Sequence, residues 1–244
     1  MQLTQKRIVI TGATSGIGKE LLKQLHVNNH IIAIGRDIDQ LSALKAISSE
    51  IKCFQVDLAD QLEVKKVVTG ILDRYETIDI LINNAAIQYV SHFMDQDYLY
   101  EHIQCEINTN LTAICSLCYL FLPTLSSNGK DGTIVNINSG LGLVPKTSSA
   151  VYCACKGAMN ILSQSLRNQL MDQKVKVFQA FLPLVDTAMT KGRGVNKMPA
   201  REAAKNIILG IERNIEDHYI GKSKVLRMLM RASPKLAQSI MRRI

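Results

Sequence analysis

The sequence predicts an α/β protein with a single doubly wound, mostly parallel sheet, a Rossmann fold with helices on both faces. Short β-branched apolar runs alternate with longer amphipathic stretches along the 244 residues. Most of these runs are continuously apolar, which is typical of parallel strands that are buried on both faces. A glycine-rich segment directly follows the first run, at the place where such sheets bind their ligands.

Strands and helices are expected to alternate along the chain. We expect strands at 7–10, 31–34, 51–56, 78–82, 133–138 and 175–181. Helical stretches are expected at about 16–28, 38–48, 60–75, 97–122, 149–172 and 200–214. Strands that are joined through helices run parallel, with right-handed crossovers. We therefore expect one Rossmann-type domain at 1–221 and a basic amphipathic C-terminal extension of the same domain at 222–244.

Composition narrows the class of protein. With 47% hydrophobic and 20% charged residues, the chain is typical of a globular protein rather than a disordered one. No apolar run approaches the roughly 20 residues that cross a bilayer, and the start lacks a signal peptide, so a cytoplasmic protein is expected. The six cysteines are then expected as free thiols. Cys115 and Cys118 form a CxxC in an apolar stretch without histidine, which predicts buried small residues and no metal site.

The net charge of +8 is concentrated at the C-terminus, where residues 222–244 carry seven basic residues and no acid. Apolar residues recur there at helical spacing, and Pro234 should divide the segment into two helices. The apolar positions are Leu226, Leu229, Met230, Leu236, Ile240 and Met241. Two interpretations stay open: contact with a membrane surface, or packing on the core or a second subunit. Nucleic-acid binding is not expected, because no aromatic interleaving accompanies the charge.

The glycine-rich segment predicts a dinucleotide-binding loop. Gly12, Gly16 and Gly18 lie directly after the first strand and at the start of a helix. Gly12 permits a tight turn, Gly16 lets a pyrophosphate approach the backbone, and Gly18 lets helix and strand pack closely. The helix N-terminus offers N–H groups to the phosphates. The Gly-Lys-Ser/Thr ending of a nucleoside-triphosphate loop is absent.

The end of the second predicted strand indicates which dinucleotide is bound. A site for NAD favours a carboxylate there, whereas this chain has Gly35 followed by Arg36. A guanidinium fits a 2′-phosphate through paired, charge-assisted hydrogen bonds. NADP(H) is therefore favoured, and Asp37, one residue later, keeps NAD(H) as the alternative.

A Ser–Tyr–Lys set follows the strand at 133–138. Tyr152 and Lys156 are four residues apart and share one helix face, and Ser139 ends the preceding strand. A nearby ammonium lowers the pKa of a tyrosine from about 10, so Tyr152 can act as a general acid or base. Ser139 can orient the substrate oxygen. Cys155 is adjacent to Lys156 and could approach this site. The arrangement suits hydride transfer between a nicotinamide and a carbonyl or alcohol.

These motifs together resemble the short-chain dehydrogenase/reductase family over about residues 5–220, with a looser likeness to its DltE-like branch. The matching segments are TGATSGIG (11–18), NNAA (83–86), INTNL (107–111), Ser139 with YCACK, and PLVDT (183–187). The resemblance implies the catalytic residues Asn110, Ser139, Tyr152 and Lys156. It implies that Asn110, rather than the rival Asn108, holds a water that links Lys156 to solvent.

The resemblance also implies a cofactor site and an assembly. Lys156 grips the nicotinamide ribose, Thr187 meets the nicotinamide amide, Asp57 meets the adenine, and Asn84 lies near a ribose. The full expected cofactor set is Gly12, Thr14, Ser15, Gly16, Ile17, Gly18, Arg36, Asp57, Leu58, Asn84, Tyr152, Lys156 and Thr187. A homodimer or homotetramer is expected through the helices at 97–122 and 149–172.

The substrate side departs from the family pattern. Ala86 and Leu184 replace glycines, and Leu184 is expected to add bulk beside the nicotinamide. Substrate contacts are expected from 88–93, 141–145 and 184–199, the last of these a candidate lid. The lid cations Lys191, Arg193 and Lys197 could attract an anionic substrate or simply be solvated.

Two functions are therefore weighed. One is an oxidoreductase that acts on a small carbonyl or secondary alcohol with NADP(H). The other is a dinucleotide-binding sensor or scaffold without turnover. The intact Ser–Tyr–Lys set favours the enzyme.

Overall fold

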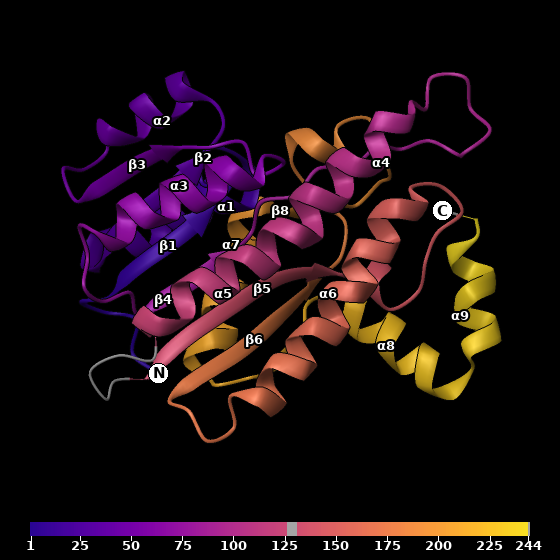
Figure 1. Cartoon of the computed structure of the whole chain (residues 1–244). Coiled ribbons are helices and arrows are strands. Elements are labelled where there is room, and N and C mark those ends of the chain that lie inside the picture. Colours follow the sequence, from indigo (N-terminus) through magenta and orange to yellow (C-terminus); the bar gives the residue numbers. More distant parts are fainter. Residues whose placement is uncertain (126–130, 244) are drawn as a thin grey trace.

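The computed structural model describes residues 1–125 and 131–243 and shows a central sheet between two helical layers (Figure 1). The sheet has the strand order β3-β2-β1-β4-β5-β6-β9, and every neighbouring pair is parallel. The strands are β1 (Arg7–Thr11), β2 (His30–Gly35), β3 (Ile51–Gln55), β4 (Ile80–Asn83), β5 (Gly132–Ser139), β6 (Val175–Leu182) and β9 (Asp217–Tyr219). The predicted fold class is confirmed.

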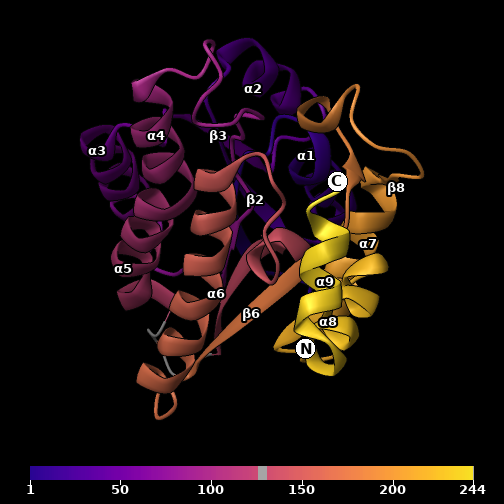
Figure 2. The same cartoon turned by 90° about the vertical axis from the view of Figure 1, so that its right-hand side faces the viewer.

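Helices cover both faces of the sheet (Figure 2). One layer contains α3 (Gln61–Leu72), α4 (Tyr100–Ile107), α5 (Ala113–Leu125) and α6 (Ala150–Gln169). The other layer contains α1 (Gly16–Leu25), α2 (Ile38–Lys45) and α7 (Ala200–Glu212). Near β9, α8 (Lys222–Ala232) and α9 (Pro234–Met241) extend the second layer.

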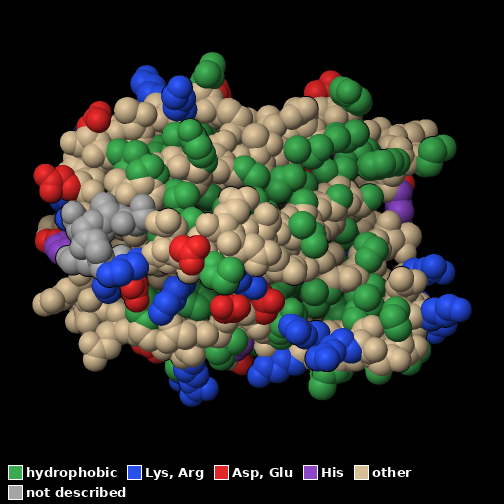
Figure 3. Space-filling view, turned by 60° about the horizontal axis from the view of Figure 1, so that its bottom comes forward, with side chains coloured by type: hydrophobic (Ala, Val, Ile, Leu, Met, Phe, Trp, Pro, Cys, Tyr) green, Lys and Arg blue, Asp and Glu red, His purple; other side chains and the backbone are tan. Residues whose placement is uncertain are grey.

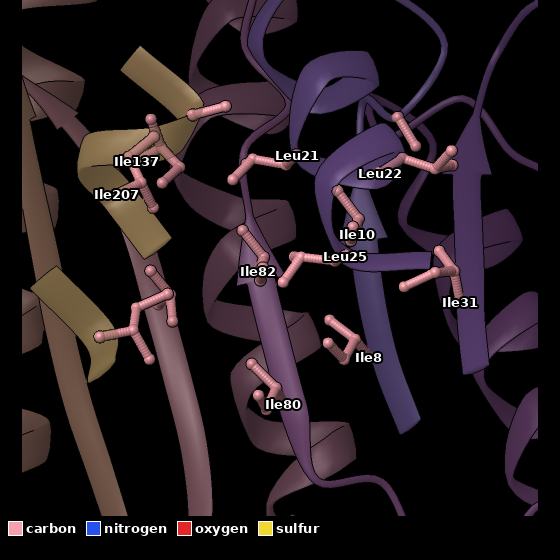
Figure 4. Packing of buried hydrophobic residues seen from close by; sticks show 14 of the residues in the cluster. Ile8, Ile10, Leu21, Leu22, Leu25, Ile31, Ile80, Ile82, Ile137 and Ile207 are labelled. Atoms are coloured by element: carbon pink, nitrogen blue, oxygen red, sulfur yellow. The ribbon is translucent and has the colours of Figure 1, made fainter. Parts of the chain in front are cut away.

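The core forms two apolar layers because successive strand residues point to opposite faces. Ile8 and Ile10 of β1 belong to the layer under α1 and α7, whereas Val9 belongs to the layer under α3 and α5. Figure 4 shows Leu21 of α1 beside Ile82 of β4 in the first layer. Full burial of each such side chain contributes about 1.5–3 kcal/mol. A sheet that is buried on both faces explains why the strands are apolar throughout.

The parallel register brings the ends of the strands to one edge of the sheet. Thr11 pairs with Ile34, and Ser139 pairs with Leu182. The strand order reverses between β1 and β4, which is the position where doubly wound sheets bind ligands. The glycine loop and the segments after β2, β4, β5 and β6 therefore all emerge at this edge.

Three elements differ from those expected. The helix predicted at 97–122 begins at Tyr100 and is interrupted by a π-helical segment, Asn108–Thr112, a feature that is frequent at functional sites. A two-stranded sheet of β7 (Val185–Asp186) and β8 (Met198–Pro199) lies in the candidate lid, and β9 adds an edge strand. These strands have two or three residues, too few for an apolar pattern to show.

The helical run Tyr100–Leu125 is 26 residues long and passes a length and hydropathy test for a membrane span, which the sequence reasoning did not expect. In this structure 44% of the most apolar 18-residue stretch of this run is buried. Its α5 segment packs against α3, and its α4 segment packs against α6. The apolar character of α5 therefore has a structural cause in the core.

The C-terminal extension is divided by Pro234, as predicted, and Pro234 opens α9. Its apolar residues divide in two: Leu226, Leu229, Met230 and Met241 pack with Val144 and its neighbours, whereas Leu236 and Ile240 are exposed. Figure 3 shows Lys and Arg side chains at the right-hand edge, the side on which α9 lies in Figure 1. Packing on the core thus holds for part of the extension, and membrane contact stays a prediction.

Candidate active site

The glycine loop packs against the end of β4. Gly12 and Gly16 have φ of +65° and +51°, a region that L side chains rarely adopt. A Cβ on Gly18 would lie 2.1 Å from the Gly12 carbonyl oxygen and 2.5 Å from Asn84 Nδ2. The close approach of α1 to the loop therefore requires glycine at position 18.

Asn84 and Thr11 tie the loop to β4. Asn84 Nδ2 donates to the carbonyl oxygens of Thr11 at 2.9 Å and of Gly12 at 3.3 Å. Thr11 Oγ1 accepts from the backbone N–H groups of Asn84 and Ala85, both at 3.0 Å. These bonds fix the loop at the point where the strand order reverses.

The N-terminus of α1 is open to an anion. Ser15 occupies the N-cap position, its side chain is exposed and makes no capping hydrogen bond, and the first turn has no acidic residue. Thr187 lies over the loop, because its Cγ2 is 3.1 Å from the position of a Cβ on Gly16. Free N–H groups at a glycine-lined helix start fit the pyrophosphate of a dinucleotide.

The rest of the expected cofactor set lies along the same edge. Thr14 lies against Gly35. Ile17 packs partly buried on the core, and Leu58 is buried. Asp57 Oδ1 accepts from the backbone N–H of Ala59 at 3.0 Å.

Asp37 is engaged as the N-cap of α2. Its Oδ1 accepts from the backbone N–H groups of Asp39 and Gln40, and its Oδ2 accepts from Gln40 Nε2 at 2.8 Å. The bond from the Gln40 backbone lowers the pKa of Asp37. Arg36 is exposed and, within the described residues, forms no ion pair. The guanidinium is thus the group at this strand end that is available to a ligand.

Lys156 and Tyr152 are buried together on the first turns of α6. Lys156 is 2% exposed, and its Nζ donates to the Ile137 carbonyl oxygen at 2.8 Å. The same Nζ lies 5.6 Å from the centroid of the Tyr152 ring. The structure therefore places the predicted pair side by side, anchored to β5.

The expected effect of Lys156 on Tyr152 is wrong for this structure. Burial raises the pKa of Tyr152, and burial lowers the pKa of Lys156 to about 8. Desolvation disfavours the charged form of each group. Because the Lys156 ammonium is directed at Ile137, it does not offset that cost for the phenolate.

Ser139 ends β5, two residues after Ile137, which accepts the hydrogen bond from Lys156. Its Oγ accepts from the backbone N–H of Leu141 at 3.1 Å, at the start of the 3-10 turn Gly140–Gly142. A Cβ on Gly142 would lie 2.7 Å from the Lys156 carbonyl oxygen, so this turn packs directly on α6. The end of β5 and the start of α6 are thus brought together as predicted.

Asn110 and Asn108 have different partners. Asn110 is fully buried in the π-helical segment, and its side-chain amide exchanges two hydrogen bonds, of 2.9 and 2.8 Å, with the backbone of Ile87. Asn108 instead donates to the Ala59 carbonyl oxygen at 3.1 Å. Asn110 therefore supports the segment that follows NNAA, next to α6, and Asn108 faces the loop after β3.

The cysteines differ in their burial and in their pKa. Burial raises the pKa of Cys155 to about 11 and that of Cys118 to about 12. Cys118 is buried as predicted, whereas Cys115 is exposed, which corrects the prediction. No group of three metal-ligating side chains occurs in the described part of the chain.

Sequence reasoning missed Glu106, a buried carboxyl beside the site. It is 1% exposed, and its Oε1 accepts from the backbone N–H of Tyr89 at 3.0 Å. Within the described residues, its Oε2 has no hydrogen-bond partner. Burial raises the pKa of Glu106, and its charge in turn raises the pKa of Tyr152 and Cys155. On an amphipathic helix a glutamate normally indicates a solvated face, so no sequence signal marked it.

Leu184 contacts the candidate lid, and its expected bulk beside the nicotinamide stays a prediction. It is 40% exposed, and its Cδ2 lies 2.4 Å from the position of a Cβ on Gly194. Gly194 has φ of +60°. Leu184 therefore supports the lid segment, and only a glycine in this conformation leaves room for it.

Comparison with known proteins identifies the class. The family described as short chain dehydrogenase matches residues 6–197. The chain is 34% identical over 192 residues to the uncharacterized oxidoreductase DltE of Bacillus subtilis, covering 78% of this chain and 76% of that protein. It is 30% identical over 200 residues to carbonyl reductase (NADPH) 2 of Sus scrofa, covering 82% and 79%. The chain belongs to the short-chain dehydrogenase family.

Solved structures share the fold. A short-chain dehydrogenase from Burkholderia cenocepacia in complex with NADP superposes with a TM-score of 0.88 at 24% identity, over 99% of both chains. One from Sphingobium yanoikuyae with NADPH gives 0.82 at 26% identity, over 95% and 94%. One from Burkholderia phymatum with NAD gives 0.85 at 18% identity, over 97% and 96%. The family and the glycine loop together make this chain an NAD(P)-dependent oxidoreductase.

Proposed function

We propose that the protein transfers a hydride between NADP(H) and a carbonyl or secondary alcohol, with Tyr152 as the general acid or base. The burial of Tyr152 beside Lys156, at the strand end that carries Ser139, is the observation that carries this proposal. A buried ammonium is costly to maintain. A sensor or scaffold protein without turnover would not need one at this position.

Each residue of the chain has a task in the proposed reaction. When bound, the nicotinamide supplies or accepts the hydride. Ser139 Oγ donates a hydrogen bond to the substrate oxygen and orients it. Tyr152 Oη gives its proton to that oxygen as negative charge develops there. Lys156 holds the ribose and returns a proton through the water that Asn110 positions.

The proposed direction is reduction of the carbonyl. A tyrosine of ordinary pKa, about 10, is protonated at neutral pH, and burial raises the pKa of Tyr152 further, so Tyr152 starts the reaction as a proton donor. The lowered pKa of Lys156, about 8, leaves that group able to pass on a proton near neutrality. The pKa of Lys156 therefore suits an amine that reloads the phenol.

NADP(H) is the proposed cofactor. The side chain of Asp37 is engaged in capping α2, whereas Arg36 is exposed at the end of β2. A 2′-phosphate would gain paired hydrogen bonds from Arg36, whereas a ribose hydroxyl would find no free carboxylate there. Titration calorimetry should show a higher affinity for NADPH than for NADH. Arg36→Ala should reduce the affinity for NADPH and leave the affinity for NADH unchanged, so the difference between them should narrow.

The test of the reaction is Tyr152→Phe. The variant should still bind NADPH but lose about 10²–10⁴-fold in the rate of NADPH consumption with a panel of aldehydes and ketones. Normal turnover by the variant would mean that the proposed mechanism is wrong. NADPH binding without turnover of the panel by the wild type would favour the sensor or scaffold function instead.

We also propose a homo-oligomer formed through α5 and α6. These helices expose large apolar side chains, with Tyr119 78% and Ile161 65% accessible. Burial of such side chains against a second copy would stabilise a symmetric interface. Replacing Ile161 with Glu should shift the mass measured by light scattering towards the monomer.

A further inference from the structure

The three lid cations have different environments. Lys191 is exposed. Lys197 forms an ion pair with Asp186 at 2.8 Å and donates to the Thr190 carbonyl oxygen. Arg193 is half-buried and turned inward, where its Nη1 donates to Gln88 Oε1 at 2.8 Å and its Nη2 donates to the Met189 carbonyl oxygen. Only Arg193 therefore connects the lid to the segment that follows NNAA.

The Arg193 guanidinium is held near α6, because its partner Gln88 follows Ile87, which binds Asn110 next to α6. Its positive charge lowers the pKa of Tyr152, in opposition to the larger effect of burial. Its own pKa is lowered by burial and raised by Tyr152. The two side chains are thus electrostatic neighbours. The Ser149 N–H donates to the Ser91 carbonyl oxygen at 3.1 Å, so the segment that binds Arg193 lies at the start of α6.

Lys146 is a second half-buried cation at the same place. It lies between the Gly140–Gly142 turn and α6, with its backbone N–H against the thiol of Cys153 on α6. Burial lowers the pKa of Lys146, and the charge of Arg193 lowers it further. Lys146, three residues before Ser149, and Arg193, bound to Gln88, therefore belong to neighbouring segments at the start of α6, joined by the Ser149–Ser91 hydrogen bond.

Neither cation has a carboxylate partner among residues 1–125 and 131–243. The charge of Glu106 raises the pKa of Tyr152 and of Cys153, but Glu106 makes no ion pair with Arg193 or Lys146 among the described residues. Partly buried charges are normally paired, because desolvation without a partner is costly. The uncharged oxygens of Gln88 and Met189 are weak substitutes for a carboxylate.

We propose that Arg193 and Lys146 bind an anionic oxygen group of the substrate, a carboxylate or a phosphate monoester. The substrate of the proposed reaction is then a carbonyl compound that carries this group close to the carbonyl. The anion displaces Gln88 from Arg193 and closes the lid over the reacting atoms. This inference rests on the proposed function and adds the substrate class to it.

The test compares charged and neutral forms of one carbonyl compound. The probes are straight-chain 2-oxo and 3-oxo acids, their methyl esters, and hydroxyacetone phosphate, each with NADPH. The wild type should show a higher kcat/KM for an acid or for the phosphate than for the ester. Arg193→Gln and Lys146→Gln should each reduce the acid-to-ester ratio about 10- to 100-fold, mainly through KM. Arg193→Lys should recover part of that loss.

Lys191→Gln is the matched control, because it removes one positive charge from the exposed part of the same lid. It should leave the acid-to-ester ratio unchanged. Equal losses on acid and ester in Arg193→Gln would overturn the inference, since Arg193 would then serve only the lid or Tyr152. A larger effect on the phosphate than on the acids would assign the anion as a phosphate.

A second readout separates this inference from the proposed function. If the wild type reduces none of the probes, thermal unfolding with the oxo acids and with inorganic phosphate still reports on the anion site. Stabilisation by these anions that is lost in Arg193→Gln and kept in Lys191→Gln supports the site even if the proposed reaction fails. Absence of any stabilisation in the wild type would overturn the site.

Discussion

The close contact at Gly18 allows a quantitative prediction for Gly18→Ala. The added methyl group would lie 2.1 Å from the Gly12 carbonyl oxygen and 2.5 Å from Asn84 Nδ2. The first atom is backbone, and the second is held by two hydrogen bonds, so neither can move aside without cost. Such overpacking costs about 1–3 kcal/mol. For a domain of this size, each kcal/mol shifts the melting temperature by about 2–4 °C, so we expect a loss of roughly 2–12 °C.

Gly70→Ala is the matched control within α3. No atom lies within 4 Å of the position that its methyl group would take. Removing a glycine from the interior of a helix stabilises it by about 1 kcal/mol, which predicts a gain of about 2–4 °C. Scanning calorimetry with and without NADPH measures both effects. Gly18→Ala should also lose the stabilisation by NADPH, since α1 is pushed away from the loop. Equal melting temperatures for the two variants would refute the steric reasoning.

Three further predictions concern the buried titratable groups. Glu106→Gln keeps the acceptor for the Tyr89 N–H but removes a carboxyl whose pKa is raised by burial. At neutral pH the variant should have a higher free energy of unfolding than the wild type, and this difference should shrink as the pH falls towards about 4.3. Chemical denaturation at several pH values measures the difference. A difference that grows in acid would contradict the prediction. At pH 7, Lys156→Met should unfold at a higher temperature than the cofactor-free wild type. The pKa of Lys156 is about 8 in the folded state, below its unfolded value of 10.5, so its charge destabilises the fold at pH 7 and the difference should vanish near pH 10.5. Iodoacetamide should spare the buried Cys155 and leave the activity unchanged. Inactivation that NADPH prevents and Cys155→Ser abolishes would contradict this.

Much of the framework could be predicted from local patterns. Continuous β-branched runs separated by amphipathic stretches indicate a parallel sheet, because burial on both faces selects those side chains. The glycine spacing after β1 placed the dinucleotide loop correctly in the fold. Tyr152 and Lys156 share a face of α6 because four residues make just over one helical turn. Such features depend on neighbours in the sequence, so one chain suffices to recognise them.

Other features had no local signal. The strands β7, β8 and β9 are too short for a pattern and exist because a longer partner strand or lid segment lies beside them. From the sequence, the carboxylate of Asp37 could bind a ribose, but in the structure it caps the start of α2. The expected lowering of the Tyr152 pKa failed because desolvation, which depends on every neighbouring atom, outweighed one nearby charge.

The sequence by itself determined the fold class, most of the strand and helix order, and the Ser–Tyr–Lys set, because these follow from local pattern and spacing, whereas the family and Asn110 followed from a resemblance of motifs. Only the tertiary structure decided how those residues are solvated and which distant groups meet them. Lys146 and Arg193 are 47 positions apart in the chain, and the buried Glu106 lies on a third segment. Their charges act on Tyr152 or on each other because the fold brings α4, the loop before α6 and the segment that binds Arg193 together at the start of α6. Electrostatic interactions depend on distance and burial in space, and neither can be read from the order of residues.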